Sequence, residues 1–152
     1  MSVLRPLRTL LRRPPSVWWD AARTVVLAGV VELGLRRMPV TRLSRLLGVH
    51  LLLDGTPAAS GITETLRLSA RERQRLDVTW RVLRHRPFNG TCLRRALLAG
   101  RVVRHRDHAV RIGVRKVDGV VSAHAWLELD GTVLDLGAVD DFKVLAPVRE
   151  AA

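Results

Sequence analysis

Three residues of this 152-residue chain carry the side chains of a nucleophile, a base and an orienting acid. Cys92, the only cysteine, follows Thr91 at the predicted start of a helix, where unpaired backbone N–H groups and the helix dipole stabilise a thiolate. His124 lies in a segment with the pattern of a strand, and Asp135 lies in the next predicted strand. Arg94 and Arg95 add positive charge beside the cysteine. This combination is typical of nucleophilic catalysis, because a thiol needs a base or a positive field to become the attacking species.

A predicted hairpin relates the histidine to the aspartate. Asp130-Gly131 is a strong signal for a two-residue turn between segments 121–129 and 132–136. Pairing about this turn sets Trp126 opposite Asp135 and places Asp135 diagonal to His124, where it can hold the imidazole tautomer. Because side chains alternate between the two faces of a strand, one face is expected to carry His124, Trp126, Glu128, Val133 and Asp135.

Each of these residues also has a purely structural interpretation. A lone cysteine is commonly a small buried hydrophobic residue, and a strand histidine is commonly just a hydrogen-bonded side chain. Trp126 fits a core position, and an aspartate near a strand end is commonly a solvated turn residue. The joint arrangement favours a catalytic site, but spacing alone leaves both interpretations open.

The motifs around these residues resemble those of the B2 proteins of lasso peptide biosynthesis. The resemblance rests on residues 92–97, 110–116 and 123–131, and it extends more loosely upstream to residues 36–40, residues 46–48 and Trp80. Those proteins are transglutaminase-like cysteine proteases that remove the leader from a ribosomally made precursor. The resemblance implies that Cys92 is the nucleophile, His124 the base and Asp135 the acid, with Asp140 and Asp141 as neighbouring alternatives for the acid.

The same resemblance implies a mechanism and partners. Cys92 attacks the last leader carbonyl and His124 protonates the leaving amine, with neither a cofactor nor a metal. The implied partners are a lasso precursor, a separate leader-recognition protein and an ATP-dependent cyclase. Two alternatives stay open: an acyl transfer through the same thioester, and a non-catalytic interaction protein of the same fold.

Composition narrows the classes of protein to consider. The length suits one domain, and a single cysteine excludes an internal disulfide and favours a reducing compartment, which we expect to be the cytoplasm. The formal net charge is +12, but the arginines form no single stripe with aromatic residues, so we do not expect nucleic-acid binding. The apolar segment 24–35 is too short to span a bilayer, and membrane contact is expected to be peripheral at most. His105 and His108 are interpreted as solvated strand-edge histidines rather than metal ligands.

The order of elements predicts an α+β fold with a papain-like or transglutaminase-like core. Residues 1–15 form a basic arm, and residues 16–152 form one domain, with a helical part over 16–90 and a nucleophile helix and antiparallel sheet over 91–145. Helices are expected over 16–38, over 41–47 closed by Gly48, and from a capping box of Ser69 and Glu72 up to Pro87. Gly100 is expected to end the nucleophile helix. The first helix is expected to pack through Val17, Ala21, Val25 and Ala28.

Overall fold

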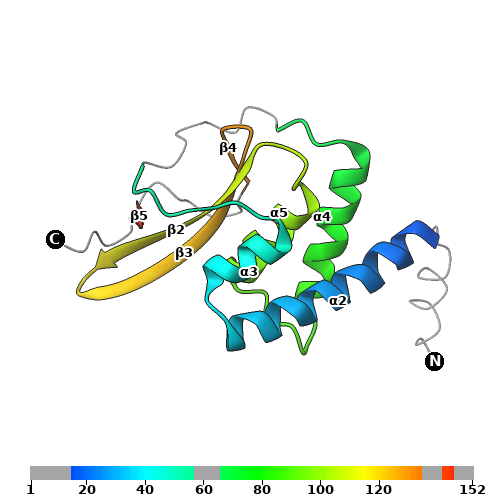
Figure 1. Ribbon diagram of the computed structural model, residues 1–152, viewed down its shortest axis with the longest axis horizontal. Helices are drawn as coiled ribbons and strands as arrows, with labels where there is room; N and C mark the ends of the chain where they lie inside the picture. The colour runs from blue at the N-terminus through cyan, green and yellow to red at the C-terminus, as the bar shows by residue number, and fades with distance from the viewer. Residues whose placement is uncertain (1–14, 57–65, 135–141, 146–152) are drawn as a thin grey trace, which may run out of the picture.

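Helices occupy the N-terminal part and most strands the C-terminal part, which is the predicted α+β arrangement (Figure 1). The computed structural model describes residues 15–56, 66–134 and 142–145. Its helices are α2 (Pro15–Arg37), α3 (Val40–Leu47), α4 (Ala70–Leu83) and α5 (Cys92–Val102). Its strands are β1 (Leu51–Leu52), β2 (His108–Val117), β3 (Val120–Leu129), β4 (Thr132–Leu134) and β5 (Lys143–Val144). The predicted basic arm lies outside the described residues except for Pro15.

The sheet is built around a long hairpin. Strands β2, β3 and β4 form the predicted antiparallel meander, and β3 meets β4 in the predicted register, with Leu129 opposite Thr132. Both hairpin turns have two successive residues with positive φ, Asp118-Gly119 and Asp130-Gly131, as the sharp turns of right-twisted hairpins require. Strand β1 joins β2 in parallel and β5 joins it antiparallel, so the sheet is mixed rather than wholly antiparallel. Strands of two residues cannot show an alternating pattern, which is why the sequence did not predict them.

Helix α5 packs closely against the sheet. It begins at Cys92 as predicted, but it continues through Gly100 to Val102, so the prediction that Gly100 ends the helix is wrong. A Cβ on Gly100 would lie 2.8 Å from Val49 Cγ1 and 3.5 Å from Leu127 Cδ1. The absence of a side chain therefore serves close packing between α5 and the sheet rather than a left-handed cap.

The buried face of α2 differs from the predicted one. Ala28 is buried as expected, but Val25 is 44 % exposed, and the buried residues of the helix are Thr24, Ala28, Val31 and Gly34. Segment 24–35 is apolar nearly all round, so spacing alone does not select a face. Small side chains on the inner face allow close approach, which leaves several large apolar side chains of α2 at the surface.

None of the helices that the structure describes combines the length and the apolar character needed to cross a bilayer.

The predicted capping box opens α4. The Ser69 hydroxyl accepts a hydrogen bond from the Glu72 N–H (3.2 Å), and Glu72 accepts one from the Ser69 N–H (2.7 Å). Burial raises the pKa of Glu72, but the hydrogen bonds from Ser69 and the charges of Arg106 and His105 outweigh it, so that the pKa lies below its ordinary value. Glu72 therefore fixes the start of α4 and ties it to the segment that follows α5.

We expect Ser69→Ala to lower the free energy of unfolding by about 1 kcal/mol, because one helix N–H loses its acceptor. This corresponds to a fall in Tm of roughly 2 to 4 °C for a chain of this size. Calorimetry on Ser69→Ala and Ser69→Asp checks it, since aspartate also caps. Equal melting of Ser69→Ala and the unchanged protein would contradict the prediction.

Candidate active site

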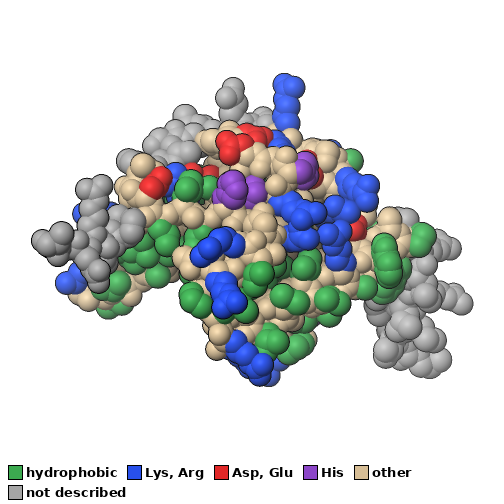
Figure 2. Space-filling model, viewed as in Figure 1, with side chains coloured by type: hydrophobic (Ala, Val, Ile, Leu, Met, Phe, Trp, Pro, Cys, Tyr) green, Lys and Arg blue, Asp and Glu red, His purple; other side chains and the backbone are tan. Residues whose placement is uncertain are grey.

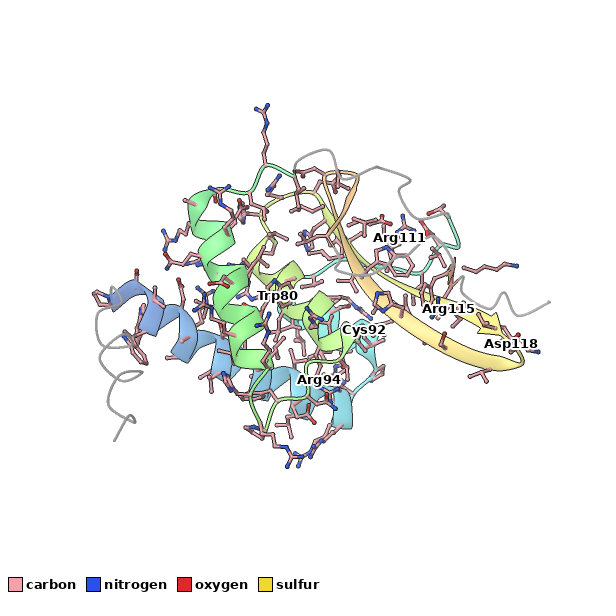
Figure 3. All side chains as sticks on the ribbon, turned by 180° about the vertical axis from the view of Figure 1, so that it is seen from behind. Trp80, Cys92, Arg94, Arg111, Arg115 and Asp118 are labelled. Carbon is pink, nitrogen blue, oxygen red and sulfur yellow. The ribbon has the colours of Figure 1, made fainter. Side chains whose placement is uncertain are left out.

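Cys92 and His124 line the same cavity. The cavity has a volume of about 130 Å³ and lies between α4, the first half of α5 and strands β3 and β4. Figure 3 shows Cys92 at the start of α5 and Trp80 on the neighbouring α4. The lining residues are Trp80, Cys92, Arg95, Ala96, Ala99, His124, Ala125, Trp126, Leu127 and Leu134. Two of the three residues predicted for the site are thus brought together.

Cys92 is the first residue of α5 and is half-buried. The first turn of the helix contains no acidic residue, so the positive end of the helix dipole at Cys92 is not offset from within that turn. Thr91 occupies the cap position, but its hydroxyl does not cap the helix and instead accepts a hydrogen bond from Arg94 (2.9 Å). A nucleophile placed here has helix N–H groups beside it that can stabilise negative charge.

The two arginines after Cys92 have separate roles. Arg94 donates to Glu32 of α2 at 2.7 Å and so anchors the start of α5. The hydrogen bond from Arg94 opposes the effect of burial and, with Arg36, holds the pKa of Glu32 below its ordinary value. Arg95 instead lies over the ring of Trp80, with its guanidinium carbon 5.0 Å from the ring centre. Only Arg95 therefore contributes positive charge to the cavity wall.

His124, on β3, lies between two aromatic rings. Its ring stacks on Trp126, with 6.2 Å between ring centres, and lies 5.2 Å from the ring of Phe142. On the adjacent strand its partner is Gly113, where a Cβ would lie 2.9 Å from both Trp126 and Phe142. Gly113 and Phe142 were not predicted to be part of the site, although an isolated glycine within a strand signals close approach.

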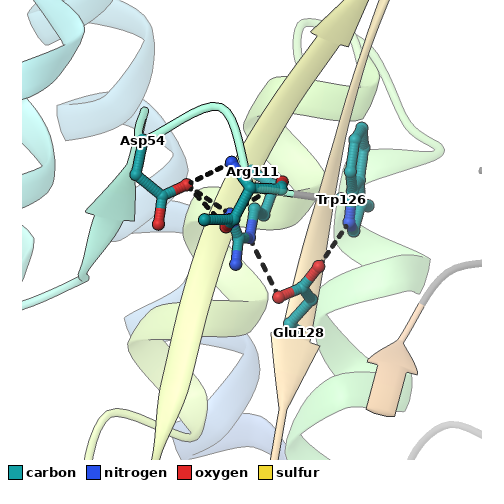
Figure 4. A network of polar contacts seen from close by, with 5 residues as sticks. Asp54, Arg111, Trp126 and Glu128 are labelled. Atoms are coloured by element: carbon teal, nitrogen blue, oxygen red, sulfur yellow. Dashed lines mark hydrogen bonds and ion pairs between the residues drawn. The ribbon is translucent and has the colours of Figure 1, made fainter. Parts of the chain in front are cut away.

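Trp126 is in turn fixed by a polar network that is buried at Trp126, Glu128 and Arg111 and reaches the surface at Asp54 (Figure 4). Its indole N–H donates to Glu128 (3.3 Å), whose other oxygen accepts from Arg111 (2.9 Å). Arg111 also donates to Asp54 (2.7 Å) and to the Thr56 hydroxyl (2.8 Å). The hydrogen bonds from Thr56, with the charge of Arg111, lower the pKa of Asp54 against the opposing effect of burial. Asp54 and Thr56, in the segment after β1, therefore support the aromatic wall behind His124.

The third predicted site residue, Asp135, lies outside the described residues, as do Asp140 and Asp141. The hairpin that leads to it has the predicted register as far as Leu127 opposite Leu134. His124, Trp126 and Glu128 share one face as predicted, since their side chains contact one another in sequence along β3. The role of Asp135 as orienting acid stays a prediction.

His108 differs from its sequence interpretation. It is only 5 % exposed rather than solvated. Its Nδ1 lies 2.9 Å from the Arg106 carbonyl, and its Nε2 accepts from the His50 N–H at 3.4 Å. A neutral imidazole with its proton on Nδ1 satisfies both contacts, so His108 is a hydrogen-bonded core residue. The sequence around His108, at the start of β2, did not predict this burial, because His50 comes from a distant segment of the chain.

A comparison with protein families adds an independent observation. A family model described as the transglutaminase-like superfamily matches residues 34–149. The chain belongs to the transglutaminase-like superfamily. The match spans α3, α4, α5 and the whole described sheet, and so includes both Cys92 and His124. Neither the curated proteins nor the solved structures contain a significant match to this transglutaminase-like chain.

We expect Gly113→Ala to destabilise the protein by about 1 to 3 kcal/mol, because the added methyl group overlaps a Trp126 ring that is only 1 % exposed. The measurement is thermal unfolding together with the near-ultraviolet circular dichroism of the tryptophans. Gly29→Ala is the control, since a Cβ there meets nothing within 4 Å and lies on a helix, where alanine is favoured. A Gly113→Ala protein as stable as the control would refute the tight fit around His124.

We expect Glu128→Gln to cost about 3 kcal/mol, because it leaves the buried Arg111 with less opposing charge. The free energy of unfolding in urea measures this. Asp77→Asn is the matched control: it removes an exposed pair with Arg81, and we expect a change below about 0.5 kcal/mol. The double variant Arg111→Met, Glu128→Leu should lose less than the sum of its single variants; additive losses would contradict coupling within the network.

Proposed function

We propose that this chain is a cysteine peptidase that removes the leader from a lasso peptide precursor. The observation that carries the proposal is that Cys92, at the start of α5, and His124, on β3, line one cavity. Membership of the transglutaminase-like superfamily supports thiol-based acyl chemistry at that cavity. The specific substrate class comes from the motif resemblance around residues 92–97 and 123–131.

The proposed reaction has two halves. The Cys92 thiolate adds to the carbonyl of the last leader residue, and the tetrahedral adduct collapses to a thioester as His124 gives a proton to the leaving amine. Water then attacks the thioester while His124 accepts its proton, which releases the leader as a carboxylate and restores the thiol. The backbone N–H of Cys92 stabilises the oxyanion in both halves, and Asp135 orients the imidazole.

The apolar, aromatic wall of the cavity suits this chemistry. Trp80 and Trp126 border the space next to Cys92 and exclude water from part of it. Where water is excluded, the local dielectric constant is lower, which strengthens the interactions of the helix N–H groups with a developing negative charge. We further propose a separate leader-recognition protein that presents the precursor, a cyclase that takes the freed core peptide, and the cytoplasm as the compartment.

The test is mass spectrometry of the precursor encoded beside this gene, incubated with the purified chain and the leader-recognition protein. We expect one cut at the junction of leader and core, and a loss of at least about four orders of magnitude in rate for Cys92→Ala. His124→Gln should lose activity to a similar degree. His105→Gln is the control, because His105 is an exposed histidine outside the cavity.

The form of the leader product separates the related activities. A free carboxylate indicates hydrolysis, whereas an amide formed with an added amine indicates acyl transfer. A folded Cys92→Ala protein that still supports cleavage would exclude Cys92 as the nucleophile. An intact precursor with the unchanged chain and its bound partner would overturn the peptidase proposal.

A further inference from the structure

A second and larger concavity lies between α2 and α4, away from Cys92. It has a volume of about 950 Å³ and none of its lining residues belongs to the cavity at Cys92. The lining residues, which define the α2–α4 groove, are Ser16, Trp19, Asp20, Ala22, Arg23, Val26, Leu27, Ala70, Arg71, Gln74 and Arg75. The groove combines aromatic and aliphatic side chains with three arginines, which is the composition of a recognition surface.

The charges of this groove are unbalanced. Asp20 is the only acidic residue in its lining, and it is already bound by Gln74 at 3.0 Å and by Arg75 at 3.3 Å. Within the part of the chain that the structure describes, Arg23 and Arg71 form no ion pair. The groove therefore presents positive charge that no described carboxylate neutralises.

A neighbouring arginine on α5 extends this positive region. The Nη1 atom of Arg101 is buried and has no hydrogen-bond partner among the described residues. Burial lowers the pKa of Arg101, and the nearby charges of Arg104 and Arg23 lower it further. A buried guanidinium nitrogen without a hydrogen-bond partner is costly, and nearby arginine charges add to the cost; a carboxylate brought close to Arg23 relieves part of it.

Exposed apolar side chains continue from the groove along α2. Trp19 is 80 % exposed and Val26 is 65 % exposed. Figure 2 shows hydrophobic side chains following α2 across the lower face, with Lys and Arg side chains gathered above them. The exposed large apolar residues of this helix are Trp18, Trp19, Val25, Val26, Val30 and Leu33. An apolar row of this length beside a cationic groove matches a partner with both apolar and acidic side chains.

Charge also narrows the choice of occupant. Residues 1–14, which precede α2, contain Arg5, Arg8, Arg12 and Arg13 and no acidic residue, so they do not complement the groove. A second copy of the chain, with its net charge of +12, would set like charges together. A bilayer complements a flat or convex apolar face, whereas Arg71 and Trp19 line a concave one. A separate acidic polypeptide fits best.

Helix α4 links the groove to the proposed active site. Arg71 and Arg75 line the groove, and Trp80 on the same helix lines the cavity with Cys92. The axial rise from Arg75 or Arg71 to Trp80 is about 8 to 14 Å. Roughly six extended residues span that distance and the turn around the helix. A partner held in the groove can therefore present an attached peptide to Cys92.

We propose that the α2–α4 groove is the docking site for an acidic, apolar segment of the leader-recognition protein. This inference rests on the proposed peptidase function for its choice of partner. The segment places carboxylates against Arg23 and Arg71 and apolar side chains against Trp19 and Val26. Docking then sets the bound leader within reach of the cavity.

The test is isothermal titration of the 152-residue chain with a leader-recognition protein chosen from its gene neighbourhood. We expect Arg71→Glu and Trp19→Ser each to weaken binding by about tenfold or more. The matched controls are Arg42→Glu, an exposed charge reversal on α3, and Val121→Ser, an exposed apolar replacement on β3. The controls should bind as the unchanged chain does, and all variants should melt at a similar temperature. Affinity should also fall as salt is raised.

Cleavage assays separate this inference from the peptidase proposal. With the groove variants, cleavage should be slow at low partner concentration and recover when the partner saturates, because Cys92 and His124 are unchanged. Equal binding by groove variants and controls would overturn the docking site even if the precursor is cleaved. Absence of binding by the unchanged chain would overturn it as well, while cleavage of the precursor alone would still support the peptidase.

Binding to lipid vesicles tests whether the groove binds a membrane instead of a protein. We expect no groove-dependent binding to vesicles of equal parts phosphatidylcholine and phosphatidylglycerol. If Trp19→Ser and Arg71→Glu release the chain from these vesicles but bind the partner normally, the groove is a lipid-binding surface and the proposal is overturned.

Discussion

The close approach of α5 to the sheet is the constraint on which the site depends. A Cβ at Gly100 would lie 2.8 Å from a side-chain carbon of Val49 and 3.5 Å from one of Leu127, so these side chains pack directly on the helix backbone. In this arrangement Cys92, in the first turn of α5, shares a cavity with His124 on β3. Glu32 secures the same end of the helix through Arg94. The position of Cys92 is thus determined at both ends of α5, by packing at one and by an ion pair at the other.

His124 is positioned by residues of the sheet rather than by α5. Its ring rests on Trp126, which Glu128 and Arg111 hold through buried hydrogen bonds. Replacing that whole buried ion pair with apolar side chains would change the stability little, whereas removing one partner leaves a buried charge unpaired. The hydrogen bond to Glu128 restricts the orientation of the indole. The missing side chain at Gly113 makes the space that the indole and Phe142 fill. The orientation of one imidazole therefore depends on residues from β2, β3 and the segment after β1.

Local chemistry was enough to predict much of this fold. The capping box at Ser69, the turn at Asp130-Gly131 and the start of α5 at Cys92 each depend on neighbours in the chain, and each has the predicted form. The shared cavity of Cys92 and His124 agrees with the motif resemblance, which pairs these two residues in one site. Contacts between distant segments could not be read in this way. The sequence does not distinguish a glycine that ends a helix from one, such as Gly100, that allows another segment to pack against the helix.

Other differences between the predicted and the observed structure also arise from contacts between distant segments. The inner face of α2 is chosen by small residues that admit α4 and α5, a property that the uniform hydrophobicity of the helix conceals. Arg111 reads as an exposed alternating position of a strand, yet it is buried because Asp54 and Glu128 meet it from both sides. The two-residue strands β1 and β5 exist only through their pairing with β2. Such features depend on the assembled sheet, which no short window of sequence contains.

Because Cys92 is the only cysteine of this chain, its oxidation differs from that of paired thiols. If an oxidant converts the Cys92 thiol to a sulfenic acid, this chain offers no second cysteine, so no internal disulfide can trap the oxidised sulfur. The sulfenic acid must be reduced by a thiol from solution or proceed to the irreversible sulfinic acid. Cys92 is half-buried in a cavity of about 130 Å³ that Trp80 also lines, which admits peroxide more readily than a large thiol. Recovery of an oxidised Cys92 therefore depends on small thiols in the surrounding solution.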